Sequence, residues 1–547
     1  MLNLKSAYFY FLATKINLIK LLKKLYFTTN FYRSSLISNI PTQFYFHLNP
    51  FLLSSFTNYK DFTFKVSEVD PNNFWAEKDL KKDTKNLHNF LWLNLITRKH
   101  DSFLIQTIIA IWIEKNSKYQ NIVWNNSILS RRIISWILNA EIIINSADNN
   151  FKKKFFRSII MQVNHLRKNV GFEGNSSKKI EVICAILLSG LVFKDYSENF
   201  EQATKDLEKL IEIFFDEDGF PINRNPDTLV HFSKYLILIK ECIKDSHQYL
   251  PDYIDNAIDK ILISLKSIIT KKYTIPLFNG ATLLNHQEYF QYIERLNYKL
   301  KKTNLRVGGL QVIRYKKNLI YFDVGQPPKK NYSSEYQSGP LSFEYYYDDE
   351  KIITNCGFGS NISKKAALLS RLTSAQSTLS LNDTSVVRFE RNKLINNAFG
   401  NSIKNNFKTF DVSFFDEERS IISTASHNAY EKDFGFYHKR TIEINKLDYL
   451  IKGTDEIVRV GKDKRVKFNI RFHLFPGIGA IKTIGGNSIL IQFKKNKSLI
   501  FSSSNQNLSI DKSIFLGGNK ILNNLCINIY GDIITGSKKI MWEIKKV

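Results

Sequence analysis

The spacing of apolar residues divides the chain into two parts. From about residue 86 to residue 270, apolar residues recur every three or four positions, as in Phe155, Ile159, Leu166 and Val170. This spacing gathers apolar side chains on one face of a helix. Turn-forming stretches such as SADNN and DEDGFP separate the helical segments. The pattern predicts serial antiparallel helices without strands between them, arranged as a bundle, a solenoid or a toroid.

Beyond about residue 300 the hydrophobic period changes to two. From Val466 to Leu474 apolar residues alternate with polar ones, and the stretches LQVIRYKKNLIYFDVG and SILIQFKKNKSLIFSS are typical of hairpins. Many strands without intervening helices favour antiparallel sheets stacked as a sandwich. We therefore expect an α+β multidomain chain with three parts. These are a basic helical or irregular segment at residues 1–85, a helical domain at 86–300 and an antiparallel β-sandwich at 301–547.

The charge of the chain narrows the class of partner. Its 547 residues carry a formal net charge of +27, most of it from lysine. Such an excess raises the local concentration of anionic partners, although a general compositional bias toward lysine, asparagine and isoleucine explains it equally well. The sequence contains no zinc-finger spacing, no RNP-type motif and no basic heptad region, so we expect no nucleic-acid partner.

Neither the cysteines nor the first residues of the chain indicate the cellular compartment of the protein. The four cysteines lie far apart and form no CxxC pair, so nothing demands disulfides. The first 27 residues contain a short apolar run that Lys15 interrupts, which is a poor signal peptide. They are typical of a basic amphipathic helix, serving either ordinary packing or a membrane-surface contact. Apolar runs elsewhere are shorter than the ~20 residues of a spanning helix, so we expect no transmembrane segment.

Short motifs between Leu87 and Pro476 supply a more specific indication. In chain order they are LHNFLWL, WNNSILSRRIISW, DEDGFPINRNPDTLVHF, PLFNG, GPLSFE, NCG, AQSTL and FHLFP. In this order they resemble the heparinase II/III family of polysaccharide lyases. The resemblance implies an N-terminal (α/α) toroid or set of helical hairpins, a C-terminal β-sandwich and a substrate cleft between them. It also implies an acidic polysaccharide as partner and a place in the cell envelope or periplasm, whereas the first residues leave a cytoplasmic location open.

The chemistry that the resemblance implies is β-elimination on a uronate. A base removes the proton at C5, and the glycosidic oxygen leaves C4 with help from an acid. Because the neighbouring carboxylate makes this proton weakly acidic, polar or cationic side chains must neutralise that carboxylate. Tyrosine and histidine are suitable proton-transfer groups, each contributing ~10²–10⁴-fold when well placed. The reaction requires no nucleophile, and we expect no cofactor.

The segment GFPINRNPDTLVHFSKY is the candidate on the helical side of the site. Asn223, Arg224 and Asn225 lie in a proline-interrupted loop, where binding residues tend to sit. Arg224 either pairs bidentately with a uronate carboxylate or bonds a helix carbonyl as an ordinary loop arginine. His231 and Tyr235 are one helical turn apart, so they share a face. They are either the acid and base or half-buried packing residues.

The candidates on the β side depart from the family pattern. Gln337 and Gln376 stand where the family usually has histidine, before LSFE and before STL. Glutamine bonds a carboxylate but cannot titrate, so either another group transfers the proton or the activity is weak or lost. His473 is a further catalytic candidate. Alternation places it beside Arg471, a substrate-binding candidate, on a strand face that lines a wet cleft or meets solvent.

Two further residues complete the predicted site. Arg371 and His427 are substrate-binding candidates, with a solvated surface arginine and a strand-bonding histidine as the alternatives. We expect no metal, because Asp383 and His473 lack a further ligand and zinc takes three or four. A hydrolase with two carboxylates is disfavoured, because turn formation explains Asp216 and Asp218.

Two functions remain at this point. The first is a polysaccharide lyase-like protein that cleaves a uronate-containing glycan by β-elimination. The alternative is a non-catalytic protein that binds acidic glycan, or assembles envelope polysaccharide, after losing the catalytic histidines.

Overall fold

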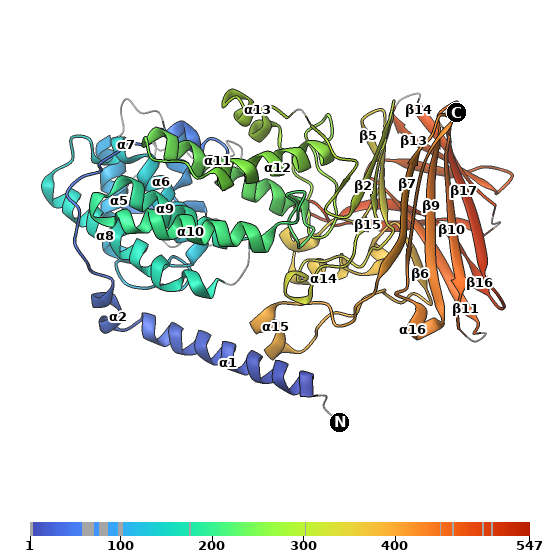
Figure 1. Cartoon of the computed structure of the whole chain (residues 1–547), viewed down its shortest axis with the longest axis horizontal. Helices are drawn as coiled ribbons and strands as arrows, with labels where there is room; N and C mark the ends of the chain where they lie inside the picture. Colours follow the sequence, from blue (N-terminus) through green and yellow to red (C-terminus); the bar gives the residue numbers. More distant parts are fainter. Residues whose placement is uncertain are drawn as a thin grey trace. The chain divides into compact units, whose positions relative to one another are not determined.

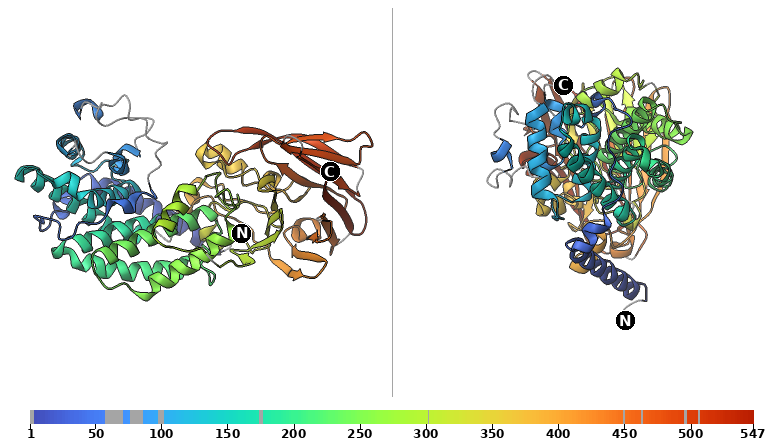
Figure 2. Two further views of the ribbon diagram at one scale, coloured as in Figure 1. Left: turned by 90° about the horizontal axis from the view of Figure 1, so that it is seen from above. Right: turned by 90° about the vertical axis from the view of Figure 1, so that its left-hand side faces the viewer.

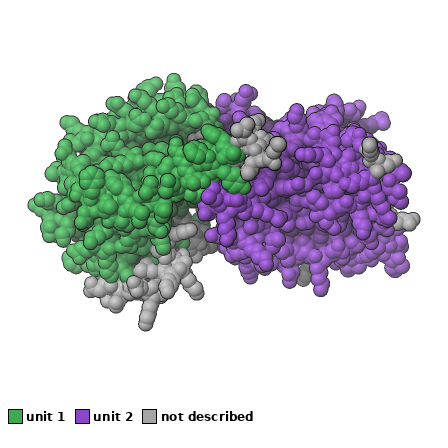
Figure 3. Space-filling model, turned by 90° about the horizontal axis from the view of Figure 1, so that it is seen from below, with its two compact units in different colours: residues 1–214, 230–259, 288–298 green, residues 215–229, 260–287, 299–547 purple. Residues whose placement is uncertain are grey.

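The structure is a computed structural model, and two compact units make up the chain. It describes residues 4–56, 71–75, 86–96, 102–173, 177–300, 302–448, 450–461, 464–494, 497–504 and 507–547. Most of residues 57–85, within the predicted basic N-terminal segment, lie outside the described residues. Unit 1 contains Met1–Phe214, Val230–Asp259 and Glu288–Tyr298, and unit 2 contains Phe215–Leu229, Lys260–Gln287 and Lys299–Val547 (Figure 3).

Helices occupy the blue-to-green part of the chain in Figure 1. Their bounds are α1 Leu4–Phe27, α2 Asn30–Ser35, α3 Pro71–Phe74, α5 Ser102–Asn116, α6 Asn126–Leu138, α7 Ala140–Ile144, α8 Asn149–Asn169, α9 Lys179–Val192, α10 Ser197–Phe214, α11 Pro226–Asp245, α12 Asp252–Ile268 and α13 Gln287–Arg295. Short 3₁₀ turns at Pro50–Leu53, Leu91–Leu95, Val170–Phe172 and Lys194–Tyr196 connect some of them.

Helix α9 lies at the centre of unit 1, packed against α6, α8 and α10. Its sequence KIEVICAILLSGLV is apolar on nearly all sides, and such a helix is expected to be buried. Gly190 permits the close approach of α10, because a Cβ atom there would lie 2.2 Å from the backbone nitrogen of Phe200. The amphipathic helix α10, in contrast, buries one stripe of apolar residues and leaves its charged face in solvent.

Unit 2 contains two antiparallel sheets. The strands are β1 Arg306–Val307, β2 Leu310–Tyr315, β3 Asn318–Asp323, β4 Phe343–Tyr347, β5 Glu350–Thr354, β6 Leu379–Leu381, β7 Thr409–Asp416, β8 Ser420–His427, β9 Phe436–Asn445, β10 Ile451–Arg459, β11 Val466–Leu474, β12 Gly479–Lys482, β13 Ser488–Lys494, β14 Lys497–Ser503, β15 Leu508–Phe515, β16 Leu522–Ile533 and β17 Lys538–Lys546. The first sheet has the order β1-β2-β3-β4-β5-β11-β16-β15, with β6 also paired to β11. The second has the order β12-β13-β14-β17-β10-β9-β8-β7. Three short helices, α14 Lys364–Leu369, α15 Lys393–Phe399 and α16 Glu431–Phe434, lie in the connections.

One hydrophobic core joins the two sheets into a sandwich. Phe343 of the first sheet stacks on Trp542 of the second, with ring centroids 5.5 Å apart. Gly453 of β10 faces Trp542 across the strand pair, and a Cβ atom there would lie 2.0 Å from the indole ring. The helical region followed by an antiparallel sandwich confirms the predicted α+β class. The closed toroid remains a prediction. No helix within the described residues has the length and apolarity to cross a membrane.

Candidate functional site

Three inner helices of unit 1 bring together an acid–base cluster made of Arg131, Glu181, His231 and Tyr235. Glu181 of α9 is buried, and its carboxylate accepts two bonds from Arg131 of α6, at 2.8 and 3.2 Å. His231 Nε2 lies 3.3 Å from Glu181 Oε1. The hydroxyl of Ser127 also donates to this carboxylate. The cluster therefore holds one buried anion between two side chains that can carry positive charge.

Glu181 is ionised in the folded protein. Burial alone would raise its pKa, but the interactions with His231 and Arg131 outweigh burial and hold the pKa at about 2. The exposed fraction is 26 % for the His231 side chain and 36 % for that of Arg131. The Nε2 atom of His231 is itself buried, so the exposed part of the ring lies elsewhere. The cluster thus presents an imidazole and a guanidinium to solvent above a fixed negative charge.

Tyr235 does not reach solvent. Its ring centroid lies 5.0 Å from that of His231, which confirms that the two residues share a helix face. Only 1 % of Tyr235 is exposed, and burial together with the nearby Glu181 raises the pKa of its hydroxyl well above the usual range. Tyr235 packs beneath His231, as the packing alternative expects, and its catalytic role stays a prediction.

Arg224 is a structural residue within unit 2. Its guanidinium donates to the carbonyls of Gly308 and Gln326 and forms an ion pair of 2.5 Å with the buried Asp323. These bonds occupy all three nitrogens, and 7 % of the residue is exposed. They also hold Arg224 at a φ of 60°, a left-handed conformation that costs energy in a non-glycine residue. The predicted pairing with a uronate is not available, because Asp323 already takes that place.

The neighbours of Arg224 are turn residues. Asn225 is buried and donates to Glu335 at 3.0 Å, and its own side-chain oxygen receives the backbone N–H of Asp227. Asn223 is half-buried and donates to Thr228. Among the three predicted loop residues, only Asn223 keeps part of its side chain in solvent.

The two glutamines lie side by side and share one acceptor. Gln337 donates to the carbonyl of Ser370 at 2.9 Å, and Gln376 donates to the same oxygen at 2.8 Å. The side-chain oxygen of Gln337 receives the N–H of Gly280. Both side chains are buried, with at most 2 % exposed. They tie two loops together, and the predicted contact of either with substrate stays a prediction.

Arg371 has the same structural role. Its three guanidinium nitrogens donate to the carbonyls of Ser333, Tyr336 and Asn401, and 2 % of the residue is exposed. The surface alternative is wrong because Arg371 is buried, and the anion-binding role stays a prediction. A buried arginine that donates to three carbonyls fixes the loops around it.

His473 is buried beneath the loop that precedes β6. Its Nε2 lies 3.0 Å from the carbonyl oxygen of Ser374, and its Nδ1 lies 3.0 Å from Ser513 Oγ. Burial, with Arg471 nearby, lowers the pKa of His473 to about 4 although the Ser374 carbonyl opposes the shift. The predicted wet or solvent-facing position is therefore wrong. Arg471 keeps 15 % of its side chain exposed and pairs with Asp383 at 2.9 Å.

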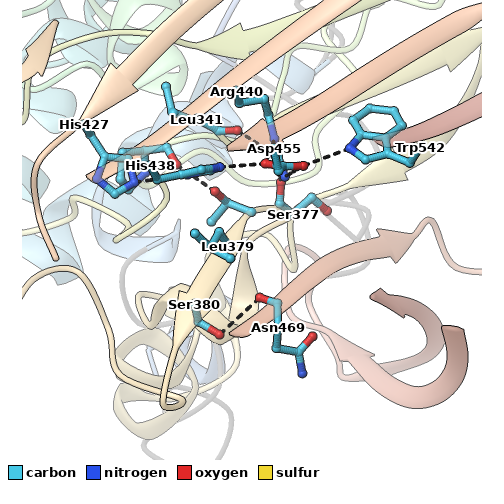
Figure 4. A network of polar contacts seen from close by, with 12 residues as sticks. Leu341, Ser377, Leu379, Ser380, His427, His438, Arg440, Asp455, Asn469 and Trp542 are labelled. Carbon is cyan, nitrogen blue, oxygen red and sulfur yellow. Dashed lines mark hydrogen bonds and ion pairs between the residues drawn. The ribbon is translucent and has the colours of Figure 1, made fainter. Parts of the chain in front are cut away.

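His427 belongs to a polar network inside the sandwich (Figure 4). Asp455 lies at its centre, accepting from Trp542 at 2.9 Å and pairing with Arg440 at 2.7 Å and His438 at 2.6 Å. His427 lies 3.3 Å from His438, and every residue of this network is buried. Burial lowers the pKa of His427 well below its usual range. The network bonds strands together, which is the alternative expected for His427, and its substrate-binding role stays a prediction.

Sequence reasoning missed Arg131, Glu181 and Asp323. Glu181 had a usable signal, since a carboxylate within the apolar run IEVICAILL is almost never buried without a partner. Its partners were not readable, because they come from helices about 50 residues away on either side. Within the described part of the chain, no three His, Cys, Asp or Glu side chains gather as a metal site would require.

Comparison with known proteins finds a family match for the C-terminal domain and a similar fold for most of the chain. Residues 299–542 match the family described as "Heparinase II/III-like, C-terminal". The crystal structure of heparinase III is similar over 94 % of this chain and 86 % of its own, with a TM-score of 0.67 and 14 % identity. The heparan sulfate lyase HepC mutant from Pedobacter heparinus is similar over 90 % and 81 %, with a TM-score of 0.65 and 14 % identity.

A curated relative covers much of the chain as well. FtsZ-localized protein C of Caulobacter vibrioides (strain NA1000 / CB15N) is 21 % identical over 449 residues, which are 78 % of this chain and 75 % of that protein. Residues 299–542 are therefore similar to a heparinase II/III-like C-terminal domain, and the fold of the chain is similar to that of heparinase III.

Proposed function

We propose that this protein acts on an acidic, uronate-containing glycan by β-elimination and that His231 is its proton-transfer group. The observation that carries the proposal is the pairing of a partly exposed imidazole with the buried, ionised Glu181. A carboxylate behind an imidazole orients the ring for proton transfer. His231 is the only predicted catalytic residue within the described residues that keeps this access to solvent.

The same cluster supplies the second requirement of the reaction. Glu181 engages Nε and one terminal nitrogen of Arg131, and 36 % of the Arg131 side chain stays exposed. A guanidinium neutralises a uronate carboxylate through charge-assisted hydrogen bonds. Because Nε2 of His231 faces Glu181, Nδ1 is the nitrogen that exchanges the C5 proton. The net charge of +27 supports the choice of an anionic substrate.

A second function has its own supporting observation. Gln337 and Gln376 replace titratable groups on the β side, and both are held by backbone bonds. A protein without the second proton-transfer group retains the ability to bind acidic glycan but not to cleave it. The alternative is therefore a non-catalytic glycan-binding or envelope-polysaccharide assembly protein.

The test measures the ultraviolet absorbance of the unsaturated uronate product with a panel of acidic polysaccharides. We expect turnover on at least one of them. His231→Gln keeps the shape of the side chain but removes its titration, so it should lower the rate by ~10²–10⁴-fold. His47→Gln, at an exposed histidine of the same unit, is the matched control and should leave the rate unchanged.

Binding measurements separate the two functions. Arg131→Gln should weaken glycan binding, whereas Arg157→Gln, at an exposed arginine of α8, should not. Absorbance that stays flat on every glycan, with binding retained, would reject the lyase in favour of the binding protein. Turnover that persists in His231→Gln would reject the role of His231 alone.

A further inference from the structure

Helix α1 exposes an apolar stripe, which Thr14 and Lys15 interrupt between Phe11 and Leu18. Six large apolar side chains along it have exposed fractions between 53 and 65 %, and they are Tyr8, Phe11, Leu18, Leu21, Leu22 and Leu25. They follow one another at intervals of three, seven, three, one and three residues, so they lie along one side of the helix. We call these six residues the outer face of α1. A soluble surface rarely leaves so long an apolar stripe in water without a partner.

The charge around this face is uniformly positive. Helix α1 contains five lysines and no acidic residue, and residues 1–60 contain no Asp or Glu at all. Lys24 is exposed beside the apolar stripe, and Lys15 is exposed within it. A helix with an apolar face and flanking lysines has the composition that binds the headgroup region of an anionic membrane.

The helix is attached to unit 1 at its C-terminal end. Lys23 donates to Asn169 at the end of α8, and Phe27 packs on Tyr32 and His165 with ring centroids 4.7 and 5.1 Å away. Figure 1 and the right-hand view of Figure 2 show the N-terminal part of α1 standing away from the other helices of the unit, with α2 at its C-terminal end. The attachment fixes the helix while the outer face remains exposed.

We propose that α1 docks this protein on the surface of a membrane that contains anionic lipid, with the helix lying in the plane of the interface. Its 24 residues give a length of about 36 Å. The lysines exclude spanning, which agrees with the absence of any spanning helix in the described part of the chain. Leucine and phenylalanine of the outer face enter the acyl boundary, and the lysines contact phosphate groups. This inference is independent of the glycan chemistry.

The first experiment is sedimentation of the full chain with vesicles. Vesicles of phosphatidylcholine with about one-third phosphatidylglycerol should bind the protein, whereas pure phosphatidylcholine should bind it far more weakly. Lys15→Gln/Lys24→Gln should weaken binding by about fivefold for each lysine removed. Raising the salt from about 50 to about 500 mM should weaken it as well.

The apolar contact is tested separately with exposed leucines. Leu21→Gln/Leu25→Gln should weaken vesicle binding by more than about tenfold, because both side chains lose their burial in lipid. The matched control is Leu305→Gln/Leu447→Gln, which makes the same change at exposed leucines outside α1 and should bind as before. In Tyr8→Trp, the fluorescence of the new indole should shift to the blue and be quenched by brominated lipid.

Three results would overturn the proposal. One is failure of the unchanged protein to bind anionic vesicles. Another is equal binding by Leu21→Gln/Leu25→Gln and its control. The third is a dimer in solution that this double variant converts to a monomer while vesicle binding stays absent, since the outer face would then contact a second copy of the chain.

Discussion

Replacing Glu181 by glutamine tests whether this buried carboxylate is ionised and stabilises unit 1. Folding lowers the pKa of this carboxyl from 4.5 to about 2. At ~1.4 kcal/mol per pKa unit, the ionised form contributes about 3 kcal/mol to the stability of unit 1 at neutral pH. Glutamine keeps the size of the side chain but loses the charge that His231 and Arg131 face. We expect Glu181→Gln to be less stable by about this amount at pH 7.

The pH dependence gives the sharper test. Because the folded pKa is the lower one, the stabilisation is complete above the unfolded value of 4.5 and disappears as pH falls through about 2. By pH 3 the difference between the two proteins should be less than half of its value at pH 7.

Tryptophan fluorescence during urea unfolding is a suitable assay. Five of the six tryptophans lie in unit 1, at positions 75, 92, 112, 124 and 136. Glu198→Gln is the matched control, since that carboxylate is 84 % exposed and its removal should change little at any pH. A stability difference that stays constant from pH 7 to pH 3, or that is absent at pH 7, would refute the assignment of Glu181 as a buried anion.

Three further substitutions probe unit 2, with hydrogen exchange of its strands as the measurement. Arg224→Ala leaves Asp323 buried and unpaired, so the free energy of hydrogen exchange in these strands should fall by about 3–5 kcal/mol. Unchanged exchange would contradict a stabilising role of the Arg224–Asp323 ion pair. Asp455→Asn should cost a similar amount by stranding the buried Arg440, and a change confined to the surface strands would argue against that network. Gln337→Glu should cost about 1–3 kcal/mol, because a carboxylate would face two carbonyl oxygens; an equally stable variant would show that these bonds are dispensable.

The periods in the sequence predicted the secondary structure of both units. The three- to four-residue spacing from Phe155 to Leu166 became the buried stripe of α8. The alternation from Val466 to Leu474 became β11, with its apolar residues in the sandwich core. These predictions succeeded because local periodicity records which side of an element faces the interior.

The candidate site was predicted less well. Alternation correctly placed His473 with Arg471 on the outer side of β11, but it carried no information about the loop that buries His473. The spacing of His231 and Tyr235 gave their shared face, but it did not show that one reaches solvent and the other does not. Whether a loop covers a side chain, and how deeply the side chain is buried, depend on residues far away in the chain.

The sequence by itself therefore determined the class of fold and the residue types available for chemistry. Only the tertiary structure decided which of those residues have partners. Arg224, Arg371 and the two glutamines are polar loop residues in the sequence, yet folding saturates their hydrogen bonds because a buried polar group without a partner is costly. Glu181 looked like one charge in an apolar helix, and long-range packing gave it the ion pairs that make the imidazole beside it the centre of the proposed chemistry.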